Sequence, residues 1–178
     1  MKKTIKRFLC VVMCFVLILP FALSAAAAGI DTGFTQKDFL VTKGNKIYNQ
    51  KGEEIILRGV NLGSWLIQED WLSPYEEAQD HHDMLEVLID RFGTERAYAL
   101  MNTYQDNWIT EYDLDQIKEM GFNCVRVPFW YRNFYSDDNG TKILDKNGEW
   151  DFRYLDRIVE ECSKRQIYVI LDMHGAPG

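Results

Sequence analysis

The feature that most constrains the fold is a continuous apolar run near the end of the chain, Tyr168-Val169-Ile170-Leu171-Asp172-Met173-His174. It lacks the polar–apolar alternation of a strand with one face in water, and such runs are typical of strands buried on both faces in parallel sheets. Cys124 to Phe129 is a second short apolar run. The residues between the two runs carry a helical pattern of apolar side chains at Leu155, Ile158, Val159 and Cys162, with Asp151 as the expected cap. A strand, a helix and a strand in this order predict a parallel βαβ unit.

The residues before this unit predict a hairpin, a strand and three helices. Lys43-Gly44-Asn45 marks a hairpin turn, and residues 54–62 are expected to form a strand. Residues 83–92 predict a helix ended by Gly93, and Thr94 is expected to cap the next helix. Thr110 to Asp113 has the capping-box pattern that begins a third helix. The buried faces of these last two helices are expected to contain Ala97, Leu100, Met101, Tyr104 and Trp108, and Leu114, Ile117 and Met120. The order is that of an α/β fold with right-handed crossovers.

The first 28 residues have the pattern of a secretory signal peptide. Four cations precede an apolar run from Phe8 to Leu23, and the small residues Ala25 to Ala28 follow it. A retained membrane anchor is the alternative, but it needs about 20 apolar residues, and Pro20 interrupts a run that is already shorter. We therefore expect a secreted or cell-surface protein with a signal peptide at 1–28, a linker at 29–38 and a folded segment at 39–178.

Charge excludes some classes of partner. Without residues 1–28 the chain has 16 Lys and Arg against 27 Asp and Glu, a formal net charge of −11. So acidic a protein is repelled by nucleic acids and anionic lipids, and neither is an expected partner. The content of 47% hydrophobic and 13% aromatic residues excludes intrinsic disorder.

The sequence predicts neither a metal site nor a phosphate loop. Cys124 and Cys162 remain after signal removal, and we expect buried free thiols, with a disulfide as the alternative that secretion permits. No Cys/His spacing suits a metal, and neither glycine-rich phosphate motif occurs. Adjacent residues do not share a helix face, so His81-His82 is interpreted as a solvated loop feature.

Chemically useful side chains follow the expected strands. In parallel α/β folds functional groups lie at the carboxyl ends of the strands. Glu69 and Trp71 follow the first strand, Arg126 lies in the second, which Trp130 follows, and His174 ends the third. Indoles stack on sugar faces and polar side chains bind hydroxyl groups, so this collection suits a carbohydrate better than a nucleotide.

Each of these residues also has a structural interpretation. Arg126 could form an ion pair with Asp172, because an unpaired guanidinium in an apolar strand is unfavourable. His174 could be a core histidine, and one or two of Trp65, Trp71 and Trp130 could be core residues. Asp172 lies two residues before His174 on the same strand face, where it could orient the imidazole.

Three blocks of sequence resemble glycoside hydrolase family 5, and most closely its exo-β-1,3-glucanase branch. The first is Leu57-Arg58-Gly59-Val60-Asn61-Leu62-Gly63-Ser64-Trp65-Leu66. The second joins Ile109 to Asp113 with Met120 to Pro128, and the third is Ile170 to Gly178. Together they span about residues 39–178 in the family's order.

The resemblance implies a secreted (β/α)8-barrel hydrolase that cleaves β-glucan with retention. The favoured linkage is β-1,3, with β-1,4 or mixed linkage as alternatives, and the full-length protein is expected to be a monomer without metal or organic cofactor. In the family one glutamate acts as acid/base and a second as nucleophile. Neither block is present, so both are expected beyond Gly178. The chain is thus expected to be an N-terminal fragment with about the first three βα units, inactive by itself.

Four residues match positions with substrate-side roles in the family. Arg126 matches the arginine that supports the nucleophile, and His174 the histidine that lines the −1 sugar subsite. Glu69 matches an acidic residue that contacts the terminal sugar in the exo-glucanase branch. Trp71 falls where that branch has a different aromatic residue, and is expected to stack on sugar.

Two alternatives remain open. Glu69, Asp70 and Asp172 are the carboxylates near these strand ends, and two of them could form a catalytic pair, although the resemblance assigns none of them to bond cleavage. A non-catalytic secreted carbohydrate-binding protein is the alternative function.

Overall fold

The computed structural model describes residues 33–72 and 78–176. The chain forms two units, residues 1–32 and residues 33–178, and all described residues belong to the second. The expected signal peptide therefore lies outside the described residues.

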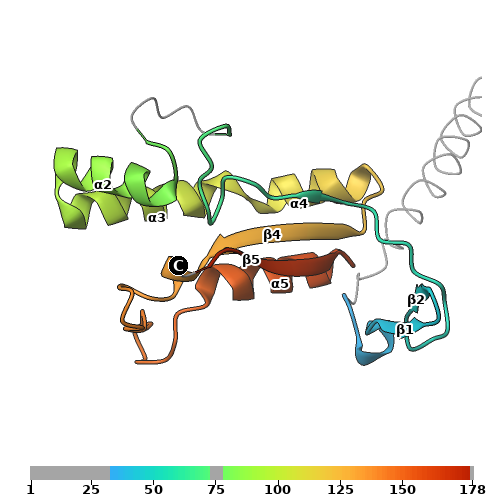
Figure 1. The fold of residues 1–178 in the computed structure, drawn as a ribbon. Coiled ribbons are helices and arrows are strands. Elements are labelled where there is room, and N and C mark those ends of the chain that lie inside the picture. Colours follow the sequence, from blue (N-terminus) through green and yellow to red (C-terminus); the bar gives the residue numbers. More distant parts are fainter. Residues whose placement is uncertain (1–32, 73–77, 177–178) are drawn as a thin grey trace, which may run out of the picture. The chain divides into compact units, whose positions relative to one another are not determined.

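The described residues form a small hairpin and a parallel sheet with helices (Figure 1). The strands are β1 (Val41–Lys43), β2 (Lys46–Tyr48), β3 (Gly59–Asn61), β4 (Cys124–Trp130) and β5 (Tyr168–Gly175). The helices are η1 (Gln36–Asp38), α2 (His81–Phe92), α3 (Thr94–Trp108), α4 (Glu111–Glu119), η2 (Tyr131–Asn133) and α5 (Arg153–Lys164). The predicted hairpin is confirmed: β1 and β2 pair antiparallel, and Gly44 in the turn has φ +65°.

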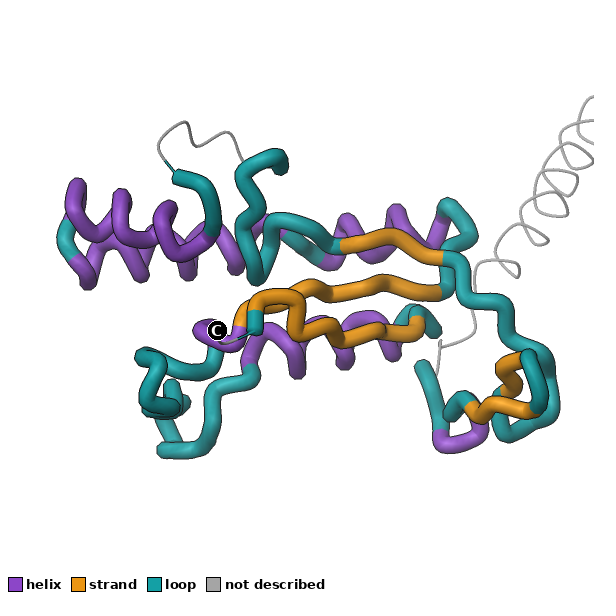
Figure 2. Tube along the Cα trace, viewed as in Figure 1, coloured by secondary structure: helices purple, strands orange, loops and turns teal. Residues whose placement is uncertain are grey.

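The sheet has the order β3-β4-β5, and both of its pairings are parallel (Figure 2). Gly59 is in register with Cys124, and a Cβ atom on Gly59 would lie 2.1 Å from the Cys124 carbonyl oxygen. Only glycine fits this close approach of two backbones. The strand predicted over residues 54–62 is shorter than expected, and before β3 the Asn123 side chain takes the place of a paired strand: it accepts from the Arg58 N–H and donates to the Ile56 carbonyl.

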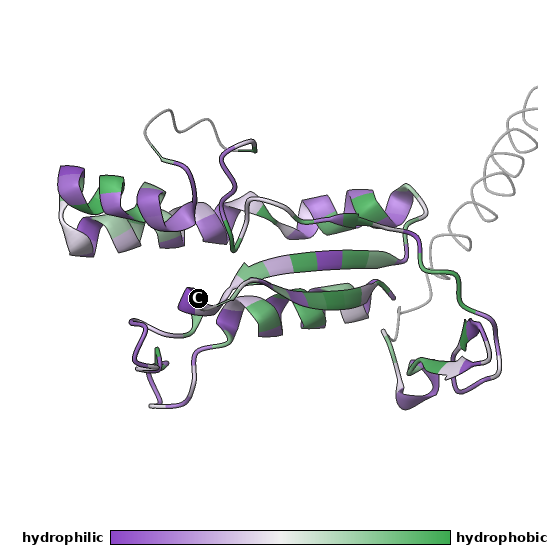
Figure 3. Cartoon of the chain, in the orientation of Figure 1, coloured by the Kyte–Doolittle hydropathy of each residue, from purple (hydrophilic) through white to green (hydrophobic). Residues whose placement is uncertain are grey.

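The main core lies where α4 and α5 pack against the sheet. Val125 and Val127 of β4 are fully buried, and α4 contributes Leu114 and Ile117. From α5 come Leu155, Ile158 and Cys162, all buried as predicted. Figure 3 shows that β4 and β5 are hydrophobic along most of their length. A separate small cluster joins α2 and α3 through Met84 and Met101.

Several local predictions need correction. The capping box at Thr110 and Asp113 is confirmed, but α3 begins after Gly93, and Thr94 is its first residue rather than its cap. Asp151 accepts a hydrogen bond from the Arg153 backbone, although the cap position of α5 is Phe152. Four residues expected on buried helix faces are 44–69% exposed, because they lie at the edge of the packed stripe: Leu100, Trp108, Met120 and Val159.

The prediction that β5 is buried on both faces is wrong for the described residues. Ile170, Leu171 and Met173 are 45–53% exposed. Within residues 33–72 and 78–176, β5 pairs with β4 alone, so it is an edge strand. The structure thus confirms a mixed α/β fold with a parallel sheet and a hairpin, while the described strands form an open sheet rather than the closed barrel expected.

Two further expectations concern thiols and membranes. Cys124 and Cys162 are both free and buried, as predicted. Burial raises the pKa of both thiols, that of Cys162 to about 12. Among the described residues no helix is long and apolar enough to cross a membrane.

Candidate functional site

Glu69 lies beside the strand ends because the chain after β3 continues alongside β4. Leu66 forms an isolated parallel bridge with Phe129, and both side chains are buried. Glu69 then forms an antiparallel bridge with Asp80, whose side chain caps α2 by accepting from the Asp83 backbone. The loop that carries Glu69 is thereby tied at one side to the sheet and at the other to α2.

A charged cluster joins β4 and β5. Arg126 is in register with Ile170, and alternate residues of a strand share a face, so Asp172 and His174 lie on the face of Arg126. The Arg126 guanidinium forms an ion pair with Asp172, and its Nη2 atom lies 3.0 Å from Nδ1 of His174. Its Nη1 atom donates to Oδ1 of Asn61 on β3 at 3.4 Å. Three neighbouring strands therefore meet at one guanidinium.

Nδ1 of His174 lies between a donor and an acceptor. It is 3.0 Å from Nη2 of Arg126, which can only donate a hydrogen bond, and 3.1 Å from Oδ2 of the Asp172 carboxylate. Nε2 is 3.7 Å from Oε1 of Glu69. A series of contacts thus runs across the carboxyl end of the sheet, from Asp172 through Arg126 and His174 to Glu69. The Glu69 carboxylate, at the end of this series, is partly exposed.

His81 holds the loop of Glu69 from the side of α2. The backbone N–H of Gln68 donates to Nδ1 of His81 at 3.0 Å, and the imidazole lies against the Trp130 ring at 4.6 Å between centroids. His81 is only 6% exposed, and burial lowers its pKa to about 4, so it is neutral at ordinary pH. The interpretation of His81-His82 as a solvated loop feature is wrong, because both residues lie in α2 and His81 is buried; only the exposure of His82 agrees with it.

These elements surround a pocket of about 720 Å³, which we call the main pocket. Glu69 and Trp71 lie on one wall, and Trp130 and Tyr131 on another. Gly175 completes the floor, where a Cβ atom would lie 2.5 Å from the Trp130 ring. The Trp71 side chain is 74% exposed, so a flat apolar face is available at the entrance. Carboxylate, indole and phenol groups around an open pocket suit a hydroxylated ligand with apolar ring faces.

The structure brings the predicted site residues together. Glu69, Arg126 and His174 form one contact series, and Glu69 and Trp71 line the same pocket. The ion pair of Arg126 with Asp172 also exists, so the structural interpretation of Arg126 is confirmed. Of the tryptophans, Trp65 is a core residue with no exposed surface. The binding roles of these residues stay predictions.

Sequence reasoning missed His81 as part of this site. The signal that could have identified it is Asp80, which precedes it as the cap of α2 and pairs with Glu69. No group of three or more His, Cys, Asp or Glu side chains in residues 33–72 and 78–176 is arranged to hold a metal ion.

Comparison with known proteins identifies the family of this chain. The profile of the cellulase family, glycosyl hydrolase family 5, matches residues 86–178. A β-xylosidase of Phanerodontia chrysosporium is 35% identical over 140 residues, which are 79% of this chain and 28% of that protein. A glucan 1,3-β-glucosidase of Candida oleophila is 33% identical over 68% of this chain and 29% of that protein.

Solved structures give the same result for the fold. The crystal structure of a rutinosidase from Aspergillus niger superposes with a TM-score of 0.53 at 25% identity, over 67% of this chain and 33% of that one. The chain spans roughly 28–34% of the length of the relatives it matches. By the family profile and these relatives, the chain belongs to the cellulase family, glycosyl hydrolase family 5.

Proposed function

We propose that the full-length protein is a secreted, retaining glycoside hydrolase that acts on β-glucan, with β-1,3-glucan as the favoured substrate. The observation that carries the proposal is the contact series from Arg126 through His174 to Glu69, which meets the main pocket at the ends of parallel strands. Relatives named glucan 1,3-β-glucosidase support the choice of linkage.

In this proposal residues 39–178 are the first part of a (β/α)8 barrel and contribute the substrate side of its active site. The unpaired edge and exposed apolar side chains of β5 support continuation of the sheet by further strands. The acid/base and the nucleophile are glutamates from the part of the enzyme that follows Gly178. Residues 1–178 alone would therefore hydrolyse no glycoside.

Each site residue has a role in this proposal. Glu69 accepts hydrogen bonds from the terminal sugar, and His174 forms a hydrogen bond through Nε2 with a hydroxyl of the sugar whose bond is cleaved. Arg126 orients His174 and Asp172 and supports the nucleophile. Trp71 stacks on a sugar face at the pocket entrance.

A second candidate substrate is a β-xyloside. It is favoured by the β-xylosidase of Phanerodontia chrysosporium, which is 35% identical over 79% of the chain. Xylose lacks the hydroxymethyl group of glucose, so the two candidates differ in the space that the main pocket leaves at that position.

The test uses full-length protein from its natural secretory host. Activity on laminarin above that on xylan and carboxymethyl cellulose is expected, with a mature N-terminus near residues 27–29. Glu69→Gln should lower activity on laminarin, whereas Glu95→Gln on the exposed side of α3 should not. Higher activity on xylan would favour the xyloside, and no hydrolysis of any glycoside would overturn the enzyme assignment.

A further inference from the structure

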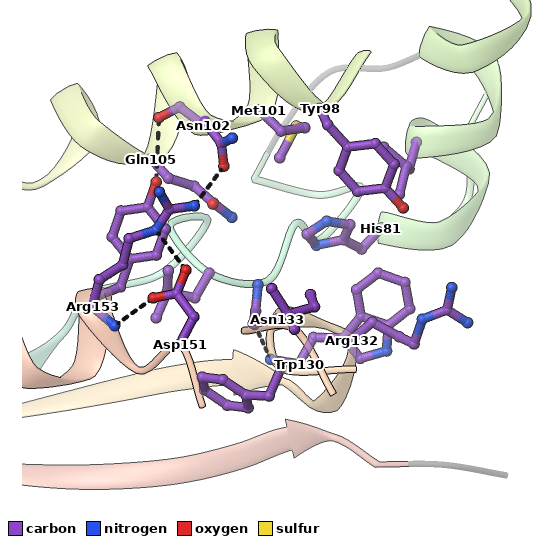
Figure 4. A pocket seen from close by; sticks show the side chains of 15 residues that line it. His81, Tyr98, Met101, Asn102, Gln105, Trp130, Arg132, Asn133, Asp151 and Arg153 are labelled. Atoms are coloured by element: carbon purple, nitrogen blue, oxygen red, sulfur yellow. Dashed lines mark hydrogen bonds and ion pairs between the residues drawn. The ribbon is translucent and has the colours of Figure 1, made fainter. Parts of the chain in front are cut away.

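One wall of the main pocket is formed by the residues at and after the end of β4. Trp130 is the last residue of β4, Tyr131 begins η2, and Asp138 lies in the loop that follows. All three line the main pocket, and we call them the second wall. The Trp130 backbone N–H donates to Oδ1 of Asn133 at 2.8 Å, which closes the turn of η2, and Figure 4 shows this bond below the His81 ring.

The Asp138 carboxylate is held through one of its two oxygens. Its Oδ1 atom accepts from the Tyr131 hydroxyl and, at 2.8 Å, from Nη1 of Arg132. Nη2 of Arg132 donates to the Ser136 carbonyl at 2.8 Å, and the guanidinium lies 5.9 Å from the centroid of the Trp130 ring. The Arg132 side chain is 18% exposed and that of Asp138 is 75% exposed. A largely buried cation therefore holds an exposed carboxylate in position.

The loop that carries Asp138 is also closed by its own hydrogen bonds. Oδ1 of Asp137 accepts from the backbone N–H groups of Asn139 at 2.9 Å and Thr141 at 3.0 Å. The Ser136 backbone N–H donates to the Thr141 carbonyl at 2.9 Å. Asp138 therefore has a defined place in the second wall, and little ordering is needed when a ligand binds to it.

The second oxygen of Asp138 is open to a ligand. In the part of the chain that the structure describes, the hydrogen bonds to this carboxylate end on Oδ1, and no group donates to Oδ2. The bonds from Tyr131 and Arg132 hold the pKa of Asp138 below its ordinary value, so Oδ2 is an acceptor at ordinary pH. An acceptor beside phenol and indole rings suits a sugar, whose hydroxyl groups donate and whose C–H faces pack on aromatic rings.

The charges of the main pocket favour a neutral sugar chain. Glu69, Asp70 and Asp138 all line this pocket. The guanidinium of Arg132 is already engaged by Asp138 and by a backbone carbonyl. A uronic acid or another anionic sugar would meet three carboxylates here, whereas the hydroxyl groups of an unsubstituted glucan can donate to them.

Asp138 is placed for a different sugar unit from the one assigned to Glu69. Oε1 of Glu69 lies 3.7 Å from Nε2 of His174, whereas no contact within residues 33–72 and 78–176 joins Asp138 to either of them. The volume of about 720 Å³ lies in the range of pockets that hold drug-sized ligands, which are larger than one sugar unit. The main pocket thus has room for two consecutive units, with an acceptor on each of two walls.

We propose that the second wall is a second sugar subsite, in which Oδ2 of Asp138 accepts a hydroxyl of the unit next to the terminal sugar. Tyr131 is a positioning residue in this subsite, because its hydroxyl holds the carboxylate. The inference rests on the proposed function, since it takes the ligand to be a β-glucan. Asp138 then determines specificity for chain length and takes no part in bond cleavage.

The test is a pair of binding titrations on the full-length protein. One ligand is thio-linked laminaritriose, a β-1,3-glucan trisaccharide that is not hydrolysed, and the other is glucose. Asp138→Asn keeps an acceptor for Tyr131 and Arg132 and replaces the free oxygen by a donor. It should weaken trisaccharide binding about tenfold and leave glucose binding unchanged. Asp90→Asn, at an exposed position of α2, is the matched control and should bind both ligands as the unchanged protein does.

A second variant tests the positioning role of Tyr131. Tyr131→Phe keeps the ring and removes the donor to Asp138, so it should weaken trisaccharide binding about two- to fivefold without changing glucose binding. Added to Asp138→Asn, the same substitution should weaken binding by less than it does alone, because the two residues act through one hydrogen bond. Equal, additive losses would remove Tyr131 from this role.

Three results would overturn the proposal. An equal loss of glucose and trisaccharide binding in Asp138→Asn would assign this residue to the terminal sugar. An unchanged trisaccharide affinity in Asp138→Asn would remove it from the site, and equal affinities of the unchanged protein for both ligands would exclude a second subsite. Hydrolysis of laminarin is measured separately. Its absence would overturn the proposed function, while a selective loss of trisaccharide binding in Asp138→Asn would still support the subsite.

Discussion

Nη2 of Arg126 on β4 lies 3.0 Å from Nδ1 of His174 on β5. This contact joins two neighbouring parallel strands at the end where the main pocket opens. The same Nδ1 atom lies 3.1 Å from Oδ2 of Asp172, and Nε2 on the other side of the ring lies 3.7 Å from Oε1 of Glu69. Arg126 and Asp172 therefore hold the His174 ring together, with Nε2 toward Glu69.

Arg126→Met is expected to disrupt ligand binding far more than folding. The substitution keeps an unbranched side chain of similar length and removes the donor to His174 and the ion pair with Asp172. A hydrogen bond to a charged group contributes about 1.5–3 kcal/mol, so kcat/KM on laminarin should fall ten- to a hundredfold or more. The ion pair is about one-third exposed, so the free energy of unfolding should change by less than about 1 kcal/mol.

Arg58→Met is the matched control for this prediction. Arg58 is exposed and directly precedes β3, at the opposite end of the sheet from the main pocket. It should leave kcat/KM unchanged. An Arg126→Met protein with unchanged kcat/KM would contradict the positioning role.

Substitution of Trp71 is expected to lower ligand affinity, whereas substitution of Trp65 is expected to lower stability. Trp71 is 74% exposed, so Trp71→Ala should leave the melting temperature unchanged and lower affinity for a glucan oligosaccharide about five- to thirtyfold through lost stacking. Trp65 has no exposed surface and donates to the Gln105 carbonyl. Trp65→Phe should destabilise the fold by about 2–3 kcal/mol. Unfolding and binding titrations on the full-length protein distinguish the two, and a stability loss in Trp71→Ala would contradict the assignment.

Local sequence patterns correctly predicted the elements whose structure depends on residues close by in the sequence. The hairpin around Gly44 and the capping box of Thr110 and Asp113 are such cases, because turn and cap chemistry act within a few residues. Functional groups of parallel α/β folds lie at the carboxyl ends of the strands. This principle, together with the family resemblance, also predicted that Glu69, Arg126 and His174 lie at the same end of the sheet.

The remaining features depend on contacts far apart in sequence. The Asp80 cap places His81 at the start of α2, but the burial of His81 depends on the loop with Gln68, which folds back onto α2. The exposure of Ile170 follows from the place of β5 at the edge of the described sheet, where it pairs with β4 alone. Met120 lies in the correct helical phase, but it is the C-cap residue of α4, beyond the last helical residue, and is 69% exposed.

The two buried thiols are expected to be unreactive in the folded protein. Cys162 has no exposed surface and burial raises its pKa to about 12, while burial also raises the pKa of Cys124. The reactive species is the thiolate, so iodoacetamide at pH 8 should leave both residues unlabelled until denaturant is added. Peptide mass spectrometry of the labelled protein provides the measurement. Rapid labelling of native protein, or a disulfide between the two, would contradict the buried free-thiol structure.

His81 is expected to make the folded state less stable as the pH falls from about 6.5 to about 4. Burial lowers its pKa to about 4, while Asp80 acts in the opposite direction and His82 adds to the lowering. Between these pH values the unfolded chain binds a proton that the folded chain does not, so stability rises with pH through this window. The shift from 6.5 to about 4 corresponds to about 3 kcal/mol, which is fully lost below about pH 4.

His81→Asn isolates this contribution, because the Asn side-chain oxygen can accept the Gln68 N–H in place of Nδ1 without binding a proton. Urea unfolding of the full-length protein at several pH values between 4 and 7 gives the comparison. The unchanged protein should lose about 3 kcal/mol more than His81→Asn over this range, since the carboxylates titrate alike in both. His82→Asn, at the exposed neighbouring position, should retain the steeper loss. If His81→Asn and the unchanged protein lose stability in parallel, His81 is not held neutral by burial and does not anchor the Glu69 loop in the way its contacts indicate.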